Sequence, residues 1–381
     1  MSNIFVYRNC FTGDVSGGDM HTGGVCEWID RNCPEHALYL IHAANDGQEK
    51  AFQETQRLRQ ITYPDTSIKN PALMFPLRAL KANRVALPWH HKSNLFIAGA
   101  HFTPDVWPAL GQGKRAPGAI RAVYIHHIIQ DMPRPASLNT VLANLQEQFC
   151  FNLIKHHFDK IITVNESVVE GLRRRGFTQP ILVSSNFVND HNVKPIAYTK
   201  KDITLAFTGR LVTQKGIDDF VYACEVLQPS VPNFKAVMIG AGPEISRLKR
   251  TIAAKKLQID VTGFVSEKRK FGLLARSQFF VFPSIEEGWG IAIAEALSVG
   301  TPVVAYDLPV YQEPFGGVIQ TVTTGDRKKL IKRITNLLTT YDKNASAYTK
   351  AQRALVERAA NFTRDTVARK EFDFLLGEQH G

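Results

Sequence analysis

The sequence predicts an α/β protein with two doubly wound domains, each built on a parallel sheet that helices cover on both faces. Short apolar runs alternate with stretches of helical spacing along most of the chain. This alternation is typical of parallel strands joined by crossover helices. The pattern restarts after a polar, proline-containing stretch at 189–202, and 381 residues are enough for two domains of roughly 150 residues each.

The first half of the chain holds apolar runs that we expect to be buried strands, with helical patterns between them. The expected strands are 4–7, 37–42, 95–98, 122–125, 161–164 and 181–184. The expected helices are 25–29, 137–157 and 166–175, and a glycine-rich stretch at 12–24 follows the first strand. Continuous apolar runs of this length are typical of strands that are buried on both faces.

The second half repeats the same organisation. The expected strands are 204–208, 236–239, 260–262, 279–282 and 303–305. The expected helices are 217–227, 244–255, 266–275 with Ser266 as its N-cap, and 290–298, and the tail 327–376 is mostly helical. Ligands of such sheets bind beyond the carboxyl ends of the strands, so we expect the site there, in a cleft between the two domains.

The composition is that of an ordinary globular protein, with 44% hydrophobic and 21% charged residues, which excludes disorder, collagen and coiled coil as the dominant state. No apolar run approaches the ~20 residues of a membrane span. The start of the chain, MSNIFVYRNCFTGD, meets polar residues too soon for a secretory signal peptide. The five cysteines are scattered without a CxxC pair, which favours reduced thiols in the cytoplasm over a disulfide frame or a zinc site.

Positive charge is concentrated in the first half of the chain. The formal net charge is +11, and the stretch 67–130 holds eight Lys or Arg residues against one acid, Asp105. Within it, 78–92 interleaves bases with Leu, Val and Trp. Such a surface suits the anionic inner face of a cell membrane or a phosphate-bearing acceptor, although a solvated basic face without a partner has the same appearance. The sequence has no helix-turn-helix, zinc-finger or RNA-binding signature, so we expect no nucleic-acid partner.

Two cations follow the first strand of the second half, in the segment FTGRLVTQKG. Gly209 allows a tight turn after the strand, and Arg210 and Lys215 project from the loop that follows. Arg and Lys at a strand end can bind a diphosphate, Arg through two parallel hydrogen bonds and Lys as a point charge. Taken alone, this motif is more often a pair of surface charges beside a turn. A second turn, IGAGPE, places Gly240 after the next strand, where a GxG motif is weak evidence for a ligand.

The segment PSIEEGWGIAIAEALSVGTPVVA carries more information. Glycines let the backbone approach a ligand, and the first amides of the helix that follows can bind phosphate with help from the helix dipole. Two glutamates separated by seven residues flank this helix start, where they can accept hydrogen bonds from sugar and ribose hydroxyls. The residues that we predict to line the site here are Glu287, Gly288, Trp289, Gly290, Ile291, Ala292 and Glu295.

With GRLVTQKG before it and GTPVVAYDLPVYQE after it, this Glu-x7-Glu segment resembles the retaining glycosyltransferases of family four, which have the GT-B fold. The resemblance is strong over 204–321 and looser, but in order, over the first half. It implies two Rossmann-like domains, with the nucleotide-sugar bound mainly by the second and the acceptor by the first. It also implies that Arg210 and Lys215 bind the diphosphate, that Glu287 faces the donor sugar and that Glu295 faces the ribose. Phe264 and Val265, in VTGFVSE, become candidates for the base.

In the first half, the resemblance implies roles for a glycine pair and a histidine pair. Gly17 and Gly18 match the early glycine loop of the family, whose amides approach the leaving phosphate. His126 or His127, at the end of YIHHI, matches a histidine that contacts the donor hexose. The final helix crosses back to the first domain. The expected domains are 1–195 with 362–381, which bind the acceptor, and 196–361, which bind the donor.

The expected reaction is transfer of a hexosyl group from a nucleoside diphosphate sugar to a hydroxyl of a lipid-linked or saccharide acceptor, with retention. The chain has no Asp-x-Asp motif, so we expect no metal and no other cofactor. No carboxylate is obviously placed as a nucleophile, which favours a front-face route over double displacement. GDP-mannose is slightly favoured as the donor over UDP-glucose and UDP-N-acetylglucosamine.

Two other classes of protein remain as alternatives. An NAD-dependent oxidoreductase typically carries the motif GxGxxG directly after the first strand. The early loop GDVSGGDMHTGG does not fit that motif. A basic binding protein without catalysis would keep the fold but has no need for Arg210, Lys215, Glu287 and Glu295 together.

Overall fold

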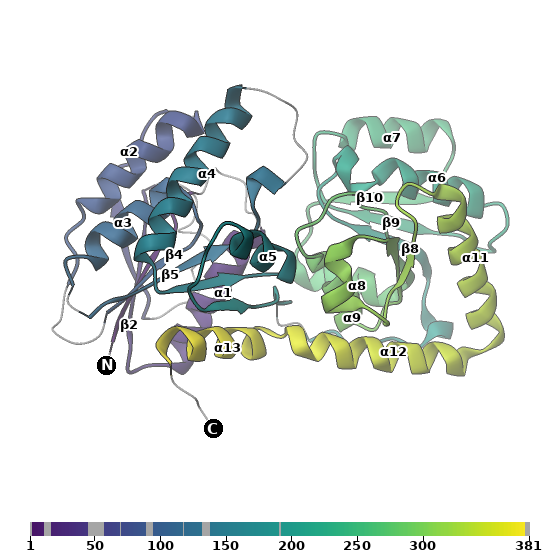
Figure 1. Ribbon diagram of the computed structural model, residues 1–381. Coiled ribbons are helices and arrows are strands. Elements are labelled where there is room, and N and C mark those ends of the chain that lie inside the picture. The colour runs from purple at the N-terminus through teal and green to yellow at the C-terminus, as the bar shows by residue number, and fades with distance from the viewer. Residues whose placement is uncertain are drawn as a thin grey trace. The chain divides into compact units, whose positions relative to one another are not determined.

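The computed structural model describes residues 2–10, 17–44, 57–68, 70–88, 94–116, 118–131, 138–189 and 192–377. The chain forms two compact units, and each contains one parallel sheet (Figure 1). Unit 1 consists of Met1–Asn186 and Arg364–Gly381, and unit 2 is Phe187–Thr363. No helix in the described part of the chain has both the length and the apolar character that crossing a bilayer demands.

The sheet of unit 1 has the strand order β3-β2-β1-β4-β5-β6-β7, with parallel pairing throughout. Its strands are β1 (Asn3–Tyr7), β2 (Ala37–Ala43), β3 (Arg59–Tyr63), β4 (Asn94–Ala98), β5 (Ile120–Ile125), β6 (Lys160–Thr163) and β7 (Ile181–Val183). Its helices are α1 (Gly17–Asn32), α2 (Pro71–Asn83), α3 (Thr103–Gly113), α4 (Leu138–His157), α5 (Glu166–Arg174) and α13 (Arg364–Leu376). Every residue of β1 is buried, as its apolar run predicts, and the ring of Phe5 stacks on Tyr39 and Phe96 at 5.0 and 4.9 Å.

The last helix, α13, packs on α1 within unit 1 (Figure 1). Trp28 Nε1 donates a hydrogen bond to Asp365 at 2.8 Å, and Arg364 pairs with Glu27 at 2.5 Å. Just before this helix, Val188 forms an isolated bridge with Thr363 inside unit 2. The chain therefore enters and leaves unit 2 at adjacent points, and its C-terminal residues complete the first unit.

Three parts of unit 1 differ from the sequence prediction. Most of the glycine-rich stretch 12–24 is not a loop, because α1 begins at Gly17. The strand β3 and the helices α2 and α3 were not predicted. Arg78, which we assigned to a basic surface, is 3% exposed, because its guanidinium binds both carboxylate oxygens of Asp65 and the carbonyl of Asn9. Lys69 and Lys92 of the same basic stretch lie outside the described residues.

The sheet of unit 2 has the order β10-β9-β8-β11-β12-β13 and is also parallel. Its strands are β8 (Ile203–Thr208), β9 (Ala236–Ile239), β10 (Ile259–Gly263), β11 (Ser277–Phe282), β12 (Val303–Tyr306) and β13 (Gln320–Val322). Its helices are α6 (Ile217–Leu227), α7 (Ile245–Ala254), α8 (Glu267–Arg276), α9 (Ile291–Ser298), α10 (Gln312–Phe315), α11 (Arg327–Lys343) and α12 (Ala345–Ala359). Ser266 caps α8 as predicted, since its side chain accepts a hydrogen bond from the amide of Arg269. The central strands β8 and β11 are almost entirely buried. Because all six strands are parallel, their carboxyl ends lie at the same edge of the sheet.

Lys201 is a buried lysine just before β8, and burial lowers its pKa from 10.5 to about 7. Its Nζ donates to the carbonyls of Ala275 and Ser277 at 2.5 and 2.9 Å. Because the pKa is depressed in the folded state, the unfolded chain binds more protons between about pH 7 and pH 10, and the free energy of unfolding rises with pH across that window. We expect Lys201→Met to flatten this rise, measured by denaturant unfolding from pH 6 to pH 10. Lys200→Met, at the exposed neighbour, is the control, and a rise that persists in Lys201→Met would contradict the assignment.

Candidate functional site

At the carboxyl edge of the sheet in unit 2, the segments that follow β8, β9 and β10 make close backbone contacts with one another at glycine residues. The amide of Gly240 donates to Gly263 O at 3.0 Å, and a Cβ on Gly240 would lie 1.9 Å from Gly209 O. A Cβ on Gly242 would lie 2.4 Å from Leu211 O. Side chains at these two positions would force the loops apart. The GxG turn therefore brings the backbones of three loops together, which the motif alone could not show.

The loop after β8 is also tied to the loop after β11. A Cβ on Gly216 would lie 1.8 Å from Pro283 O, and Gly216 has a φ of +66°. The amide of Ile285 donates to Gln214 O at 3.0 Å, and Ser284 Oγ donates to the same oxygen at 3.2 Å. These contacts hold the short 3₁₀ helix Thr213–Lys215 beside the segment that carries Glu287.

The structure brings two predicted site residues into direct contact. Lys215 Nζ lies 2.5 Å from Glu287 Oε1, and these side chains are only 21% and 10% exposed. Arg210, in the same loop, is exposed, and its side chain has no hydrogen-bond or ion-pair partner among the residues that the structure describes. One cation of the predicted pair is thus compensated by a carboxylate, and the other is left with its charge directed to solvent.

The turn between Glu287 and α9 combines exposed and buried residues. Gly288 is exposed, whereas Trp289 is 3% exposed and packs edge-on against Phe315 and Phe362 at 5.0 and 5.1 Å. The Trp289 side chain is thus part of the core and anchors the turn. Gly290 caps α9 with a φ of +105°, and the first helical residues, Ile291 and Ala292, are half-buried. The helix start is consequently held in place from inside the unit.

Glu295 lies on α9, where its carboxylate accepts a hydrogen bond from Lys270 of α8 at 2.7 Å. Lys270 also binds Glu267 at 2.7 Å. Burial raises the pKa of Glu295, and the ammonium of Lys270 opposes that rise. Burial acts to lower the pKa of Lys270, but the two carboxylates outweigh it and raise that pKa. Sequence reasoning missed Lys270, although its spacing of three from Glu267 on an expected helix was a visible signal.

The aromatic side chain of Phe264 is exposed to solvent directly after the end of β10. Phe264 follows Gly263, which has a φ of +71°, and Phe264 is 91% exposed. Val265 is half-buried beside it. An exposed phenyl ring costs little in stability, but it offers a flat apolar surface for stacking. Both candidates for contacting a base thus lie at the same sheet edge as Gly240.

The first unit holds the other predicted residues. His126 and His127 directly follow β5, and their rings belong to different clusters. His126 lies beside His21 and Tyr124, with ring centroids 6.0 and 5.9 Å away, whereas His127 lies 5.6 Å from His101. Gly17 and Gly18 form the first turn of α1 rather than a loop. The residues before them, 11–16, lie outside the described part of the chain.

His126 is the more constrained of the two histidines. Its Nε2 is buried without a hydrogen-bond partner in the described structure, and burial together with neighbouring histidines holds its pKa well below 6.5. Next to it, Glu371 of α13 accepts hydrogen bonds from Tyr124 Oη at 2.6 Å and from His21 Nε2 at 2.7 Å. His126 is therefore neutral near pH 7. The role of Glu371 could not be seen in the sequence, because 350 residues separate it from His21.

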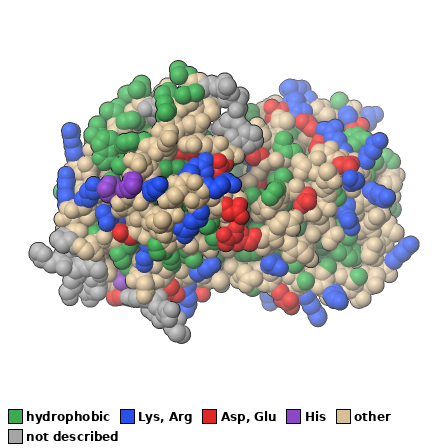
Figure 2. Space-filling model, in the orientation of Figure 1, with side chains coloured by type: hydrophobic (Ala, Val, Ile, Leu, Met, Phe, Trp, Pro, Cys, Tyr) green, Lys and Arg blue, Asp and Glu red, His purple; other side chains and the backbone are tan. Residues whose placement is uncertain are grey.

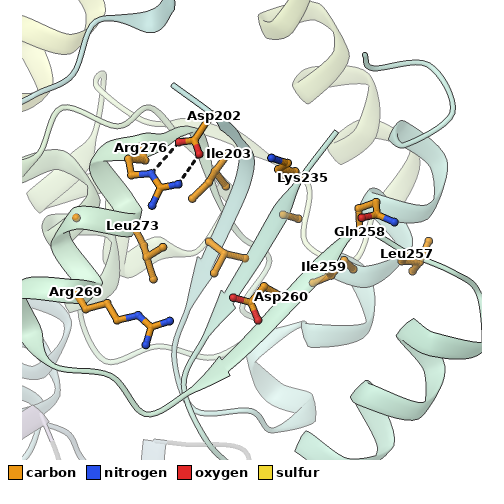
Figure 3. A pocket seen from close by; sticks show the side chains of 13 residues that line it. Asp202, Ile203, Lys235, Leu257, Gln258, Ile259, Asp260, Arg269, Leu273 and Arg276 are labelled. Carbon is orange, nitrogen blue, oxygen red and sulfur yellow. Dashed lines mark hydrogen bonds and ion pairs between the residues drawn. The ribbon is translucent and has the colours of Figure 1, made fainter. Parts of the chain in front are cut away.

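In unit 2, a pocket of about 680 Å³ opens at the amino ends of β8, β9 and β10, the edge of the sheet opposite to the one that carries Lys215 and Gly240 (Figure 3). Its walls include the ion pair between Arg276 and Asp202, together with Asp260 and Arg269. None of the predicted site residues lines it. Because the candidate residues of unit 2 lie at the carboxyl edge, that edge and not this pocket is the candidate site in unit 2. The described residues contain no cluster of three or more His, Cys, Asp or Glu that could hold a metal.

Residues 189–354 match the family described as Glycosyl transferases group 1. A GDP-mannose-dependent alpha-(1-6)-phosphatidylinositol dimannoside mannosyltransferase of Mycobacterium tuberculosis is 36% identical over 107 residues, which are 28% of each chain. A 2-deoxystreptamine N-acetyl-D-glucosaminyltransferase of Niallia circulans is 31% identical over 104 residues, 27% of each chain. These alignments thus span 27–28% of the length of the curated relatives.

Solved structures resemble the whole chain. Anabaena Alr3699/HepE, in complex with UDP and glucose, has a TM-score of 0.71 at 16% identity, covering 98% of this chain and 99% of that one. Sucrose-phosphate synthase from Thermosynechococcus elongatus has a TM-score of 0.72 at 14% identity, covering 99% of each chain. At this level of identity the likeness establishes the fold.

Proposed function

We propose that the protein is a retaining hexosyltransferase, because it has the GT-B fold and its residues 189–354 match the family described as Glycosyl transferases group 1. The donor is a nucleoside diphosphate sugar, and the acceptor is a hydroxyl group of a saccharide or a lipid-linked saccharide. The observation that carries the proposal is the contact between Lys215 and Glu287, with the exposed Arg210 in the same loop as Lys215. A cation for phosphate and a carboxylate for sugar hydroxyls thus lie together where a sheet of this kind binds its ligand.

The diphosphate is assigned to groups that carry or mimic positive charge. Arg210 offers a forked set of donors that matches phosphate oxygens, and Lys215 adds a point charge. The first amides of α9, at Ile291 and Ala292, add partial positive charge from the helix dipole. Together these groups replace a metal ion in this proposal, since they stabilise the negative charge that develops as the diphosphate departs.

The two glutamates are assigned to hydroxyl groups. Glu287 accepts hydrogen bonds from the donor hexose, and the contact with Lys215 orients its carboxylate. Glu295, held by Lys270, accepts from the ribose. Phe264 and Val265 are assigned to the base. His126 and His127 remain candidates for a further contact with the hexose, and a neutral imidazole suits that role.

The chemistry that we propose follows a front-face route. The bond between the anomeric carbon and the diphosphate oxygen breaks while the acceptor oxygen bonds to the same face of the sugar. The proton of the acceptor hydroxyl passes to the departing phosphate oxygen. This route needs no nucleophilic carboxylate from the protein, and the carboxylate of Glu287 already has a partner in Lys215.

GDP-mannose is the donor that we favour, with UDP-glucose and UDP-N-acetylglucosamine next. The name of the Mycobacterium tuberculosis relative specifies GDP-mannose, and the Anabaena structure contains UDP and glucose. A thermal-shift panel of UDP, GDP, ADP and NAD tests the proposal. We expect stabilisation by one diphosphate and none by NAD. Stabilisation by NAD alone would favour an oxidoreductase, and a lack of any shift would favour a protein without this activity.

Replacing Phe264 with Ala tests the assignment of the base. Stacking of a base on an aromatic ring contributes about 1–3 kcal/mol, so we expect roughly tenfold weaker nucleotide binding by calorimetry. The free energy of unfolding should change by less than about 0.5 kcal/mol, because the ring is 91% exposed. Tyr222→Ala, at a 37% exposed aromatic on α6, is the matched control and should bind normally. Equal affinities of Phe264→Ala and wild type would remove Phe264 from the site.

A further inference from the structure

Hydrophobic side chains gather on the surface of unit 1 over α2 and α4 (Figure 2). Nine of the thirteen large hydrophobic side chains that are exposed in the described residues lie on α2, α3 or α4. We call this group the apolar face. It consists of Leu73, Leu77, Leu80, Trp107, Leu138, Val141, Leu142, Leu145 and Phe149. An exposed group of this size on a folded protein marks an interaction surface.

The apolar face follows the helical repeat on both outer helices. On α2, Leu73, Leu77 and Leu80 are spaced by four and three residues, and all three are at least 37% exposed. On α4 the exposed residues are spaced in the same way, and they reach 75% exposure at Leu138 and 58% at Leu145. These stripes therefore lie on the outward sides of two helices whose inner sides also pack apolar residues on the core, so both helices carry apolar residues where a surface helix is usually polar.

Hydrogen bonds hold the three helices in one layer. Gln112 of α3 donates to the carbonyl of Asn83 at the end of α2 at 2.8 Å. Gln146 of α4 donates to Thr103 of α3 at 2.9 Å. Trp107 therefore lies on a helix, α3, that is hydrogen-bonded to both α2 and α4. The apolar face is consequently formed by three helices that pack together in the folded protein, and not by one isolated helix.

The exposed charges that directly follow α2 and α3 in the described residues are positive. The only carboxylates on α2, α3 and α4 are Asp105 and Glu147, which are 1% and 0% exposed. Two acids from neighbouring segments, Asp65 and Asp131, are paired with Arg78 and Arg175 at 2.6 and 2.7 Å. In contrast, three exposed bases follow α2 and α3. We call them the basic rim, and they are Arg84, Lys114 and Arg115.

We propose that the apolar face and the basic rim together bind the surface of an anionic lipid bilayer. Leucines and aromatic rings enter the boundary between headgroups and acyl chains, while Lys and Arg pair with anionic headgroups. A second copy of the chain is a poorer occupant. The carboxylates on and next to this face are buried or already paired, so a second copy would offer no free negative charge to the basic rim. The sequence pointed to a membrane through its basic residues, whereas the structure supplies a leucine-rich face.

Sedimentation with vesicles tests this proposal and needs no sugar donor, so it is independent of the proposed reaction. The vesicles are phosphatidylcholine alone, or phosphatidylcholine with one third phosphatidylglycerol. We expect the wild type to sediment with the anionic vesicles and several-fold less with the neutral ones. Leu77→Glu and Leu145→Glu should each weaken binding roughly tenfold or more, because a charge replaces an inserted side chain. Val226→Glu, at a 42% exposed residue of α6, is the matched control and should bind as wild type does.

The basic rim has its own test. Lys114→Gln combined with Arg115→Gln should remove the preference for anionic vesicles, whereas Lys249→Gln with Arg250→Gln, at an exposed pair on α7, should leave it intact. Unfolding midpoints verify that each variant is folded. The proposal is overturned if the wild type ignores anionic vesicles or if both Leu→Glu variants bind as well as wild type. It is also overturned if light scattering shows a wild-type dimer that Leu145→Glu converts to a monomer.

Discussion

Replacing Lys215 with Ala is expected to lower turnover about 100-fold or more while the fold survives, because one well-placed donor to a developing charge contributes roughly 3–4 kcal/mol. The substitution removes the ammonium that we assign to the diphosphate. It also leaves the Glu287 carboxylate, 10% exposed, without its partner. An unpaired carboxylate beside a diphosphate adds repulsion to the loss of attraction. The measurement is turnover at saturating donor, together with the unfolding midpoint.

Lys255→Ala is the matched control for this substitution. Lys255 forms an ion pair with Glu225 at 2.6 Å in the same unit, but both side chains are more exposed than those of Lys215 and Glu287. We expect its turnover to stay within twofold of wild type, because exposed pairs contribute little and this one is remote from the carboxyl edge. If Lys215→Ala retained turnover within threefold of wild type, Lys215 would not be the diphosphate ligand.

Replacing Gly216 with Ala is expected to lower the free energy of unfolding by about 3 kcal/mol or more. The new Cβ would lie 1.8 Å from the carbonyl oxygen of Pro283, and a backbone oxygen cannot swing aside as a side chain can. The φ of +66° adds strain of its own for any residue other than glycine. Because Gly216 directly follows Lys215, nucleotide binding should weaken in parallel. The measurements are denaturant unfolding and calorimetry with the stabilising nucleotide.

Gly325→Ala separates the two causes. Gly325 has a φ of +80°, and no atom lies within 4 Å of the position of its Cβ. We expect this control to cost about 1–2 kcal/mol from backbone strain alone and to leave nucleotide binding unchanged. If both glycine substitutions lowered the free energy of unfolding by the same amount, the close approach of Gly216 to Pro283 would contribute nothing to the effect of Gly216→Ala.

The sequence predicted most of the sheets because buried parallel strands are continuous apolar runs. The run 4–7 became Asn3–Tyr7, and 204–208 became Ile203–Thr208. The helices α2 and α3 were missed for two reasons. Prolines lie inside both of them, at Pro76 and Pro108, where they indicate a break. The outward side of α2 is also apolar, which hides the polar stripe by which a surface helix is recognised.

At the candidate site, the sequence placed Lys215 and Glu287 in loops that follow two strands, but it could not show that their side chains are in contact. Contacts between distant segments have no local signature, which is why the partner of Glu295 on α8 was also missed. The same limit explains the wrong prediction for Arg78. The sequence indicates a surface base, but in the structure its guanidinium is buried against Asp65 and the carbonyl of Asn9. Local chemistry therefore predicted which residue types the site contains, and the tertiary structure supplied their pairing.

The return of α13 to unit 1 has a consequence for biosynthesis. Unit 1 takes its final helix from residues after 363, so a ribosome finishes all of unit 2 before the cover of α1 is available. Until Asp365 and Glu371 emerge, the indole of Trp28 and the imidazole of His21 lack their carboxylate acceptors. The half of the protein that is translated first is thus the last to be completed, and the surface of α1 that α13 covers stays exposed on the nascent chain until residues 364–376 have been synthesised.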